Sequence, residues 1–110
     1  MLLDHQTQPD LKRFFEVVLP AVLANAPPVK GRCLVEVFSG PSWLIDFAAG
    51  QVTVGGGPSD ARIRASAEDF AALLTGALDG SKAVAEERLL VEGDEVVVMH
   101  LAELMEQAGA

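Results

Sequence analysis

The spacing of apolar residues changes twice along this chain, and this change limits the available folds more than any other feature. Between residues 11 and 23, apolar side chains recur every three or four positions, which is the period of an amphipathic helix. Between residues 33 and 65 they alternate with polar ones, as in half-buried strands. Helical spacing returns after Ser66. A helix, a block of strands and further helices are typical of an α+β fold.

The first predicted helix has start and stop signals. Thr7-Gln8-Pro9-Asp10 fits a capping box in which Thr7 is the N-cap. Pro20 lies within the helix and predicts a bend, and Pro27 and Pro28 end it. The apolar stripe of this helix comprises Leu11, Phe14, Phe15, Val18, Leu19, Val22 and Leu23.

Four short strands follow, separated by turns at residues 40–42, 49–50 and 55–60 that are rich in Gly, Pro and Ser. Because the strands are short and consecutive, we expect them to pair as an antiparallel meander. Residues 88–92 read as a fifth strand. The four consecutive strands lie within residues 33–38, 43–47, 52–54 and 62–66.

The last third of the chain alternates between helix and strand signals. Ser66-Ala67-Glu68-Asp69 is a second capping box, and its helix is expected to stop near Asp79-Gly80. Residues 81–87 form a short helical or irregular link. For residues 94–106 a hairpin strand competes with a helix, because Val96, Val97 and Val98 favour strands. Asp94 is a good N-cap, so the helix is favoured.

Composition excludes several classes of function. The chain has 110 residues, the size of a single domain, and a formal charge of −8 from 16 acidic and 8 basic residues. This sign disfavours nucleic acids and anionic membranes as partners. No signal peptide or membrane-length apolar run is evident, so we expect a soluble, cytoplasmic protein without stable membrane insertion. Cys33 is alone and reads as a small core residue.

No catalytic, cofactor or metal-binding motif is predicted. Gly55-Gly56-Gly57 lacks the lysine and following helix of a phosphate loop and reads as a turn. His5 and His100 have no nucleophile beside them in sequence, and His100 reads as a surface residue of the last helix despite Glu103 three positions on. Arg62 and Arg64 share one strand face, where they either meet an anionic headgroup or are offset by nearby acids; the second is favoured.

Three segments together resemble the sterol carrier protein type 2 (sterol-binding domain) family. These are SWLIDFAAGQVTV, DARIRASAEDFAALLTGALDG and ERLLVEGDEVVVMHLAELME, at residues 42–54, 60–80 and 87–106, in the family's order. The resemblance covers residues 10–106 of one domain spanning 1–110. It implies a five-stranded, mainly antiparallel sheet with helices packed on one face, a helical tail and an apolar tunnel for lipid. The short link at 81–86 departs from the family and puts the size of the tunnel in doubt.

The resemblance implies a non-catalytic lipid-binding or lipid-transfer domain that holds a sterol, fatty acyl or isoprenoid ligand. Strand alternation and helical stripes also place Val52, Val54 and Leu73 in the interior. The alternative is an accessory or dimerisation module that docks on a partner enzyme, as in ubiquinone biosynthesis or an alkylsulfatase-like assembly. For a carrier, we expect the last helix to be a movable cover with few anchoring contacts. The predicted lipid-binding residues are Trp43, Ile45, Phe47, Ile63, Phe70, Leu74, Leu78, Leu89, Val91, Val97, Leu101, Leu104 and Met105.

Overall fold

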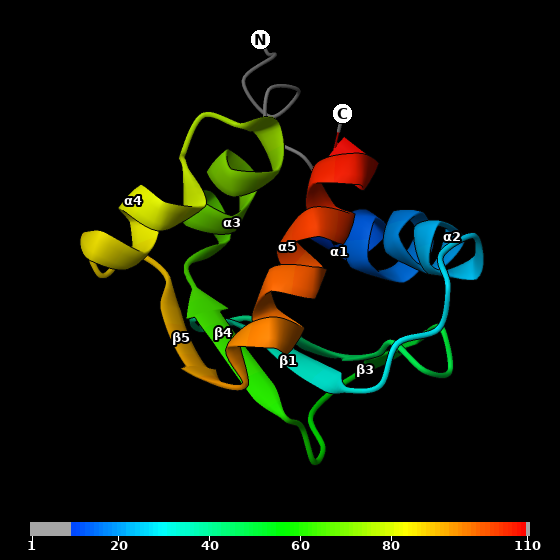
Figure 1. Cartoon of the computed structure of the whole chain (residues 1–110). Coiled ribbons are helices and arrows are strands. Elements are labelled where there is room, and N and C mark those ends of the chain that lie inside the picture. The colour runs from blue at the N-terminus through cyan, green and yellow to red at the C-terminus, as the bar shows by residue number, and fades with distance from the viewer. Residues whose placement is uncertain (1–9, 110) are drawn as a thin grey trace, which may run out of the picture.

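The computed structural model describes residues 10–109 and has two layers, helices on one side and a five-stranded sheet on the other (Figure 1). No helix within these residues is both long enough and apolar enough to cross a membrane. The elements run in the order α1 (Leu11–Arg13), η2 (Phe14–Val18), α2 (Leu19–Ala24), β1 (Arg32–Val37), β2 (Ser42–Asp46), β3 (Gln51–Val54), β4 (Ala61–Ala65), α3 (Ala67–Thr75), α4 (Gly80–Ala85), β5 (Leu90–Gly93) and α5 (Glu95–Gly109).

The first helix is continuous from α1 through η2 to α2, but its middle turn is a π-helix. Pro20 has no N–H and its ring crowds the preceding turn. The chain accommodates this by widening the turn before it, so that the N–H of Leu19 donates to the carbonyl of Phe14. The expected N-cap was wrong: Asp10 caps the helix by accepting from the N–H of Arg13. Thr7 lies outside the described residues.

The sheet order is β3-β2-β1-β4-β5, which corrects the expected four-strand meander. β1, β2 and β3 do pair antiparallel, but β4 returns to the other side of β1 and lies parallel to it, with Val35 opposite Ile63. β5 then pairs antiparallel with β4. The chain between β3 and β4 therefore has to pass β2 and β1, and Gly57 in this segment lies so close to the side chain of Leu44 that a Cβ there would be only 3.0 Å from it. The sheet is mixed, with antiparallel pairs predominating.

Two of the helices that follow β4, α3 and α5, begin where the capping signals predict. Ser66 caps α3 by accepting from the N–H of Asp69. This helix ends earlier than expected, at Thr75, because Gly76 takes a left-handed conformation with φ 83°. Asp79 is not the end of α3 but the N-cap of α4. The tail is a helix, as favoured, and the side chain of Asp94 accepts from the N–H of Val96.

The core lies between the sheet and α2, α3 and α5, and it is built mostly from the inward positions of β1, β2 and β4. Alternation decides which side chains these are, since successive residues of a strand point to opposite faces. Phe15 stacks on Trp43 with ring centroids 4.6 Å apart and meets Phe70 edge-on. The largest fully buried side chains are Trp43, Phe15, Phe70, Leu19, Ile45, Leu101, Val35 and Cys33.

Candidate functional site: the apolar hollow beside helix α5

Helix α5 lies across the middle of the sheet and is anchored by buried side chains. Val97, Leu101 and Leu104 recur at helical spacing and are 6%, 1% and 2% exposed. The helix contacts β1 and β4 beneath it and α2 and α3 beside it. The expectation that few contacts anchor this helix is therefore wrong, and its role as a movable cover stays a prediction. The stripe that predicted the helix is part of the main core.

One flank of α5 is closed. The imidazole of His100 meets the ring of Phe47, just after β2, edge-on with centroids 4.8 Å apart. Helix α2 packs against α5 as well. His100 is half-buried in this contact, and its role in the described structure is packing rather than that of a free surface residue.

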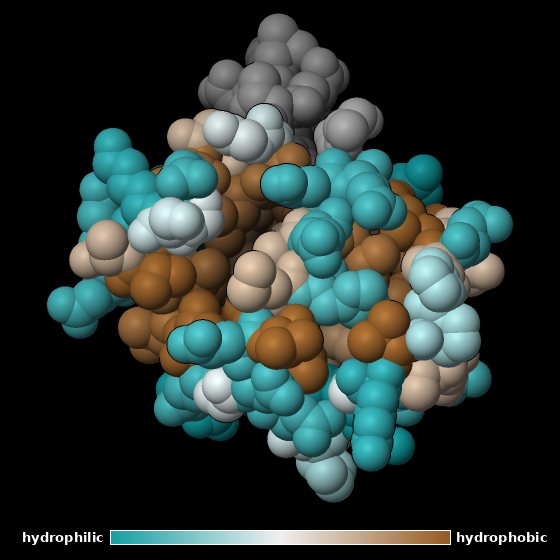
Figure 2. Space-filling view, in the orientation of Figure 1, coloured by the Kyte–Doolittle hydropathy of each residue, from teal (hydrophilic) through white to brown (hydrophobic). Residues whose placement is uncertain are grey.

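The other flank of α5 is incompletely packed. Val98 and Met105 are seven residues apart, which is close to two helical turns, so they share this flank, away from His100. Both are half-buried, as are Leu74 on α3 and Val91 on β5. Figure 2 shows brown, apolar side chains in a hollow between α5 and the α4–β5 side of the molecule. The half-buried apolar residues of α3, α5, β5 and its approach are Leu73, Leu74, Leu89, Val91, Val98 and Met105.

The structure divides the predicted interior residues into three groups. Val54 is a correction: as part of the edge strand β3 it is 60% exposed. A half-buried group contains Val52, Leu73, Leu74, Leu89, Val91 and Met105. The fully interior group contains Trp43, Ile45, Phe47, Ile63, Phe70, Leu78, Val97, Leu101 and Leu104.

A second recess, of about 330 Å³, opens at the N-terminal end of the first helix, and its lining includes Leu11, Val37 and Trp43. Trp43 is fixed beside it, because its indole N–H donates to Glu16 Oε2 at 2.9 Å. This bond is the main cause of a lowered pKa for Glu16, and the Lys12 ammonium 3.0 Å away adds to the effect. The bond was missed in the sequence, since Glu16 lies on the polar face of the helix and nothing local pairs it with a strand.

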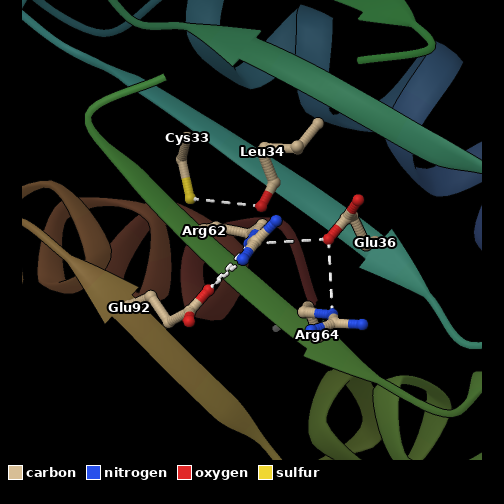
Figure 3. Close-up of polar contacts among 6 residues, drawn as sticks. All are labelled: Cys33, Leu34, Glu36, Arg62, Arg64 and Glu92. Carbon is tan, nitrogen blue, oxygen red and sulfur yellow. Dashed lines mark hydrogen bonds and ion pairs between the residues drawn. The ribbon is translucent and has the colours of Figure 1, made fainter. Parts of the chain in front are cut away.

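The sheet face opposite the helices contains a ladder of charges (Figure 3). Arg62 forms a hydrogen-bonded ion pair with Glu92, which raises the pKa of Arg62. Glu36 Oε1 lies 3.4 Å from Nε of Arg64 and 3.6 Å from Nε of Arg62, distances of ion pairs rather than hydrogen bonds. Arg64 also lies over the Phe38 ring, with its guanidinium carbon 5.5 Å from the ring centroid. The two arginines are thus offset by acids, as favoured from the sequence.

The remaining reactive residues are placed as follows. Cys33 is buried, as expected, and burial raises the pKa of its thiol to about 12, which keeps it protonated. Within residues 10–109, no three His, Cys, Asp or Glu side chains gather closely enough to hold a metal ion. His5 lies outside the described residues. Another pair that sequence reasoning missed is Arg88 with Asp69, which ties the approach to β5 onto α3 and lowers the pKa of Asp69.

Comparisons with known proteins agree with this fold. The sequence model of the SCP-2 sterol transfer family matches residues 11–106. No curated protein matches significantly. Palmitated sterol carrier protein 2-like 2 from Aedes aegypti has a TM-score of 0.68 at 22% identity, covering 88% of this chain and 95% of its own. Sterol carrier protein-2 from the same organism, in complex with palmitate, has a TM-score of 0.70 at 17% identity and covers 96% of both chains.

A third solved structure is a ubiquinone synthesis protein, UbiJ-SCP2. Its TM-score is 0.67 at 22% identity, and the match covers 98% of this chain and 95% of that one. At these identities the structural likeness establishes the fold, a mixed five-stranded sheet with helices on one face, and leaves the ligand to chemical argument.

Proposed function

Since this chain belongs to the SCP-2 sterol transfer family, we propose that it binds a lipid-like apolar ligand in the hollow between α5 and the α3–β5 side of the fold. The ligand is held and released, with no bond made or broken. The single observation that supports this is the group of half-buried apolar side chains on facing elements, displayed in Figure 2. Such side chains remain partly in water until something apolar covers them.

The energetics favour a chain-like ligand. Each methylene that leaves water contributes about 0.8 kcal/mol, so ten buried methylenes would contribute roughly 8 kcal/mol before the losses of association. Palmitate, which two of the similar solved structures carry, has this chemistry. An acyl, isoprenoid or sterol ligand would satisfy the same apolar walls.

The predicted lipid-binding residues divide by burial into walls and support. Leu74, Leu89, Val91 and Met105 are half-buried and would touch the ligand. The others hold the walls in place from within the closed core, and Leu101 and Leu104 seal the space directly under α5. We therefore propose that the ligand lies beside α5, along its open flank, rather than beneath it.

The test is a titration with a fluorescent fatty acid. We expect saturable binding by the native chain and at least about a tenfold loss in Leu74→Asp, because a carboxylate in the hollow would have to be desolvated. The matched control is Val17→Asp, a change of similar kind on η2 where the side chain is 53% exposed. Equal binding by both variants, or no binding by the native chain, would contradict the proposal.

A second candidate is an accessory module that presents an isoprenoid to a partner enzyme, or that dimerises. The match to the ubiquinone synthesis protein, which covers nearly the whole of this chain, favours it. Native mass spectrometry of protein purified from its own host distinguishes the two: a co-purified lipid supports the carrier, and a ligand-free complex with another protein supports the module.

A further inference from the structure

The two edges of the sheet differ in whether they can accept another strand. β3 and β5 are the edge strands. An edge strand presents unpaired N–H and C=O groups, and proteins usually block such a strand with charge, proline or a bulge. β3 has the sequence Gln51-Val52-Thr53-Val54, with none of these devices. β5 ends on Gly93, whose φ of 93° is not that of a regular strand. The backbone N–H and C=O of Gly93 are therefore poorly oriented to pair with another strand.

The hydrogen bonds around β2 determine which groups of β3 face outward. Gly55 N–H donates to the carbonyl of Ser42 at 2.8 Å, and these two residues are opposite each other in the β2–β3 register. Hydrogen-bonded pairs recur at every second residue of an antiparallel ladder. Thr53 and Gln51 therefore direct their backbone groups toward β2, and Val52 and Val54 direct theirs toward the free edge.

The hydrogen bonds between β1 and β2 confirm independently which residues of β2 are left to bond β3. Phe47 N–H donates to the carbonyl of Gly31 at 3.1 Å, and Val37 N–H donates to the carbonyl of Pro41 at 3.0 Å. In this ladder the odd residues of β2, Trp43 and Ile45, bond toward β1. The even residues of β2 are thus left to bond β3, as the Gly55 contact requires.

We propose that β3 pairs antiparallel with β3 of a second copy of this chain, about a two-fold axis at Thr53, to form a continuous sheet across the dimer. In this register Val52 lies opposite Val54 of the second copy, and each such pair exchanges both of its N–H···O bonds. A two-fold axis is the commonest symmetry of protein dimers. This register pairs both outward residues of β3 with outward residues of the second copy, whereas an axis at Val52 or at Val54 would leave the other valine opposite a residue outside the strand.

The side chains fit the same register. Val54 is 60% exposed and Val17, on the η2 segment that contacts β3, is 53% exposed. Pairing would place Val54 against Val52 of the second copy, on the helix-covered side of the sheet. β3 itself contributes no charge. The formal charge of −8 on each copy opposes association, so the dimer should strengthen as salt screens the repulsion.

Cysteine trapping tests this geometry. At Thr53 the two Cα atoms would lie about 4.5 Å apart, a separation that a disulfide can bridge. Gln51 is the matched control on the same strand: it would lie opposite Gly55, about 13 Å from its own symmetry mate and out of reach. Cys33 is buried and its thiol pKa is raised to about 12, so it should not form disulfides with the introduced cysteines.

Under mild oxidation we expect Thr53→Cys to yield about tenfold more disulfide dimer than Gln51→Cys.

Substitutions at Val54 test the dimer without a disulfide. Val54→Pro removes an outward N–H from each of the two copies, so the association constant measured by analytical ultracentrifugation should fall about tenfold. Val54→Lys should abolish the dimer, whereas Val96→Lys, at a 72% exposed position of α5, should leave it. Equal trapping of the two cysteine variants, or a native chain that stays monomeric in high salt at millimolar concentration, overturns the proposal.

Discussion

The two flanks of α5 share one helix but differ in how completely they are packed. On one side His100 meets Phe47 and α2 fills the remaining space. The other side, which carries the half-buried Val98 and Met105, borders an apolar hollow (Figure 2). A close-packed interior resists insertion, so the incompletely packed flank is where a ligand can enter without displacing the core. The difference between the flanks therefore supports the proposed position of the ligand, which apolar composition alone would not suggest.

Deleting α5 gives the largest expected effect. Removing residues 95–110 takes away Val97, Leu101 and Leu104, which are all buried. Truncating even one such side chain to Ala typically costs about 2–5 kcal/mol, and a whole domain has about 5–15 kcal/mol to lose. We expect the shortened chain to be unfolded by circular dichroism. A folded sheet in its absence would support the idea of α5 as a movable cover.

Substitutions on the two flanks should differ in their effect on stability. Phe47→Ala should lower the free energy of unfolding by about 3–5 kcal/mol, because it opens a cavity on the closed flank. Met105→Ala should lower it by only about 1 kcal/mol, since its side chain is half-buried and water can fill the space. Urea denaturation measures both. Similar losses at the two positions would mean that the flanks are equally packed.

A larger side chain on the open flank should lower ligand affinity and leave the free energy of unfolding almost unchanged. Leu74→Trp adds volume where the structure has a hollow, so the free energy of unfolding should change by less than about 1.5 kcal/mol. Affinity for a fluorescent fatty acid should fall about tenfold, which corresponds to 1.4 kcal/mol. Unchanged affinity would show that the ligand lies elsewhere, and the recess beside Trp43 would be the next place to probe.

The smallest expected effect concerns the pH dependence of the bond between Glu16 and Trp43. The pKa of Glu16 is lowered, chiefly by the bond from the Trp43 indole. A carboxylate with a lowered pKa contributes stability above its unfolded-state pKa and loses that stability as the pH falls through the folded value. Trp43 fluorescence should therefore titrate with a midpoint below the ordinary glutamate value of 4.5. The transition should vanish in Glu16→Gln and move upward in Lys12→Met. A midpoint at or above 4.5 in the native chain would contradict this assignment.

Local capping signals correctly predicted the starts of α3 and α5, although at the first helix Asp10 and not Thr7 is the N-cap. Ser66 and Asp94 cap the helices that they predict, because a cap bonds its own first turn. Alternation correctly placed Trp43, Ile45 and Ile63 inside, since the strand period alone fixes which face a side chain joins. The apolar residues of α5 at helical spacing likewise predicted a helix correctly. The resemblance to a family then supplied the overall fold.

Only the tertiary structure decided which strands are neighbours and which apolar residues stay half-exposed. β4 lies parallel to β1, an arrangement between distant segments that no local period encodes. Val54 shares its strand and its alternation with Val52, yet Val54 is 60% exposed and Val52 is half-buried, because only part of this edge strand is covered by other elements. Leu74 and Met105 belong to stripes that look continuous with the core, and their half-burial depends on how far α3 stands from α5. Periodicity sets the direction of a side chain, but whether another element fills the space in front of it depends on contacts between residues far apart in the chain.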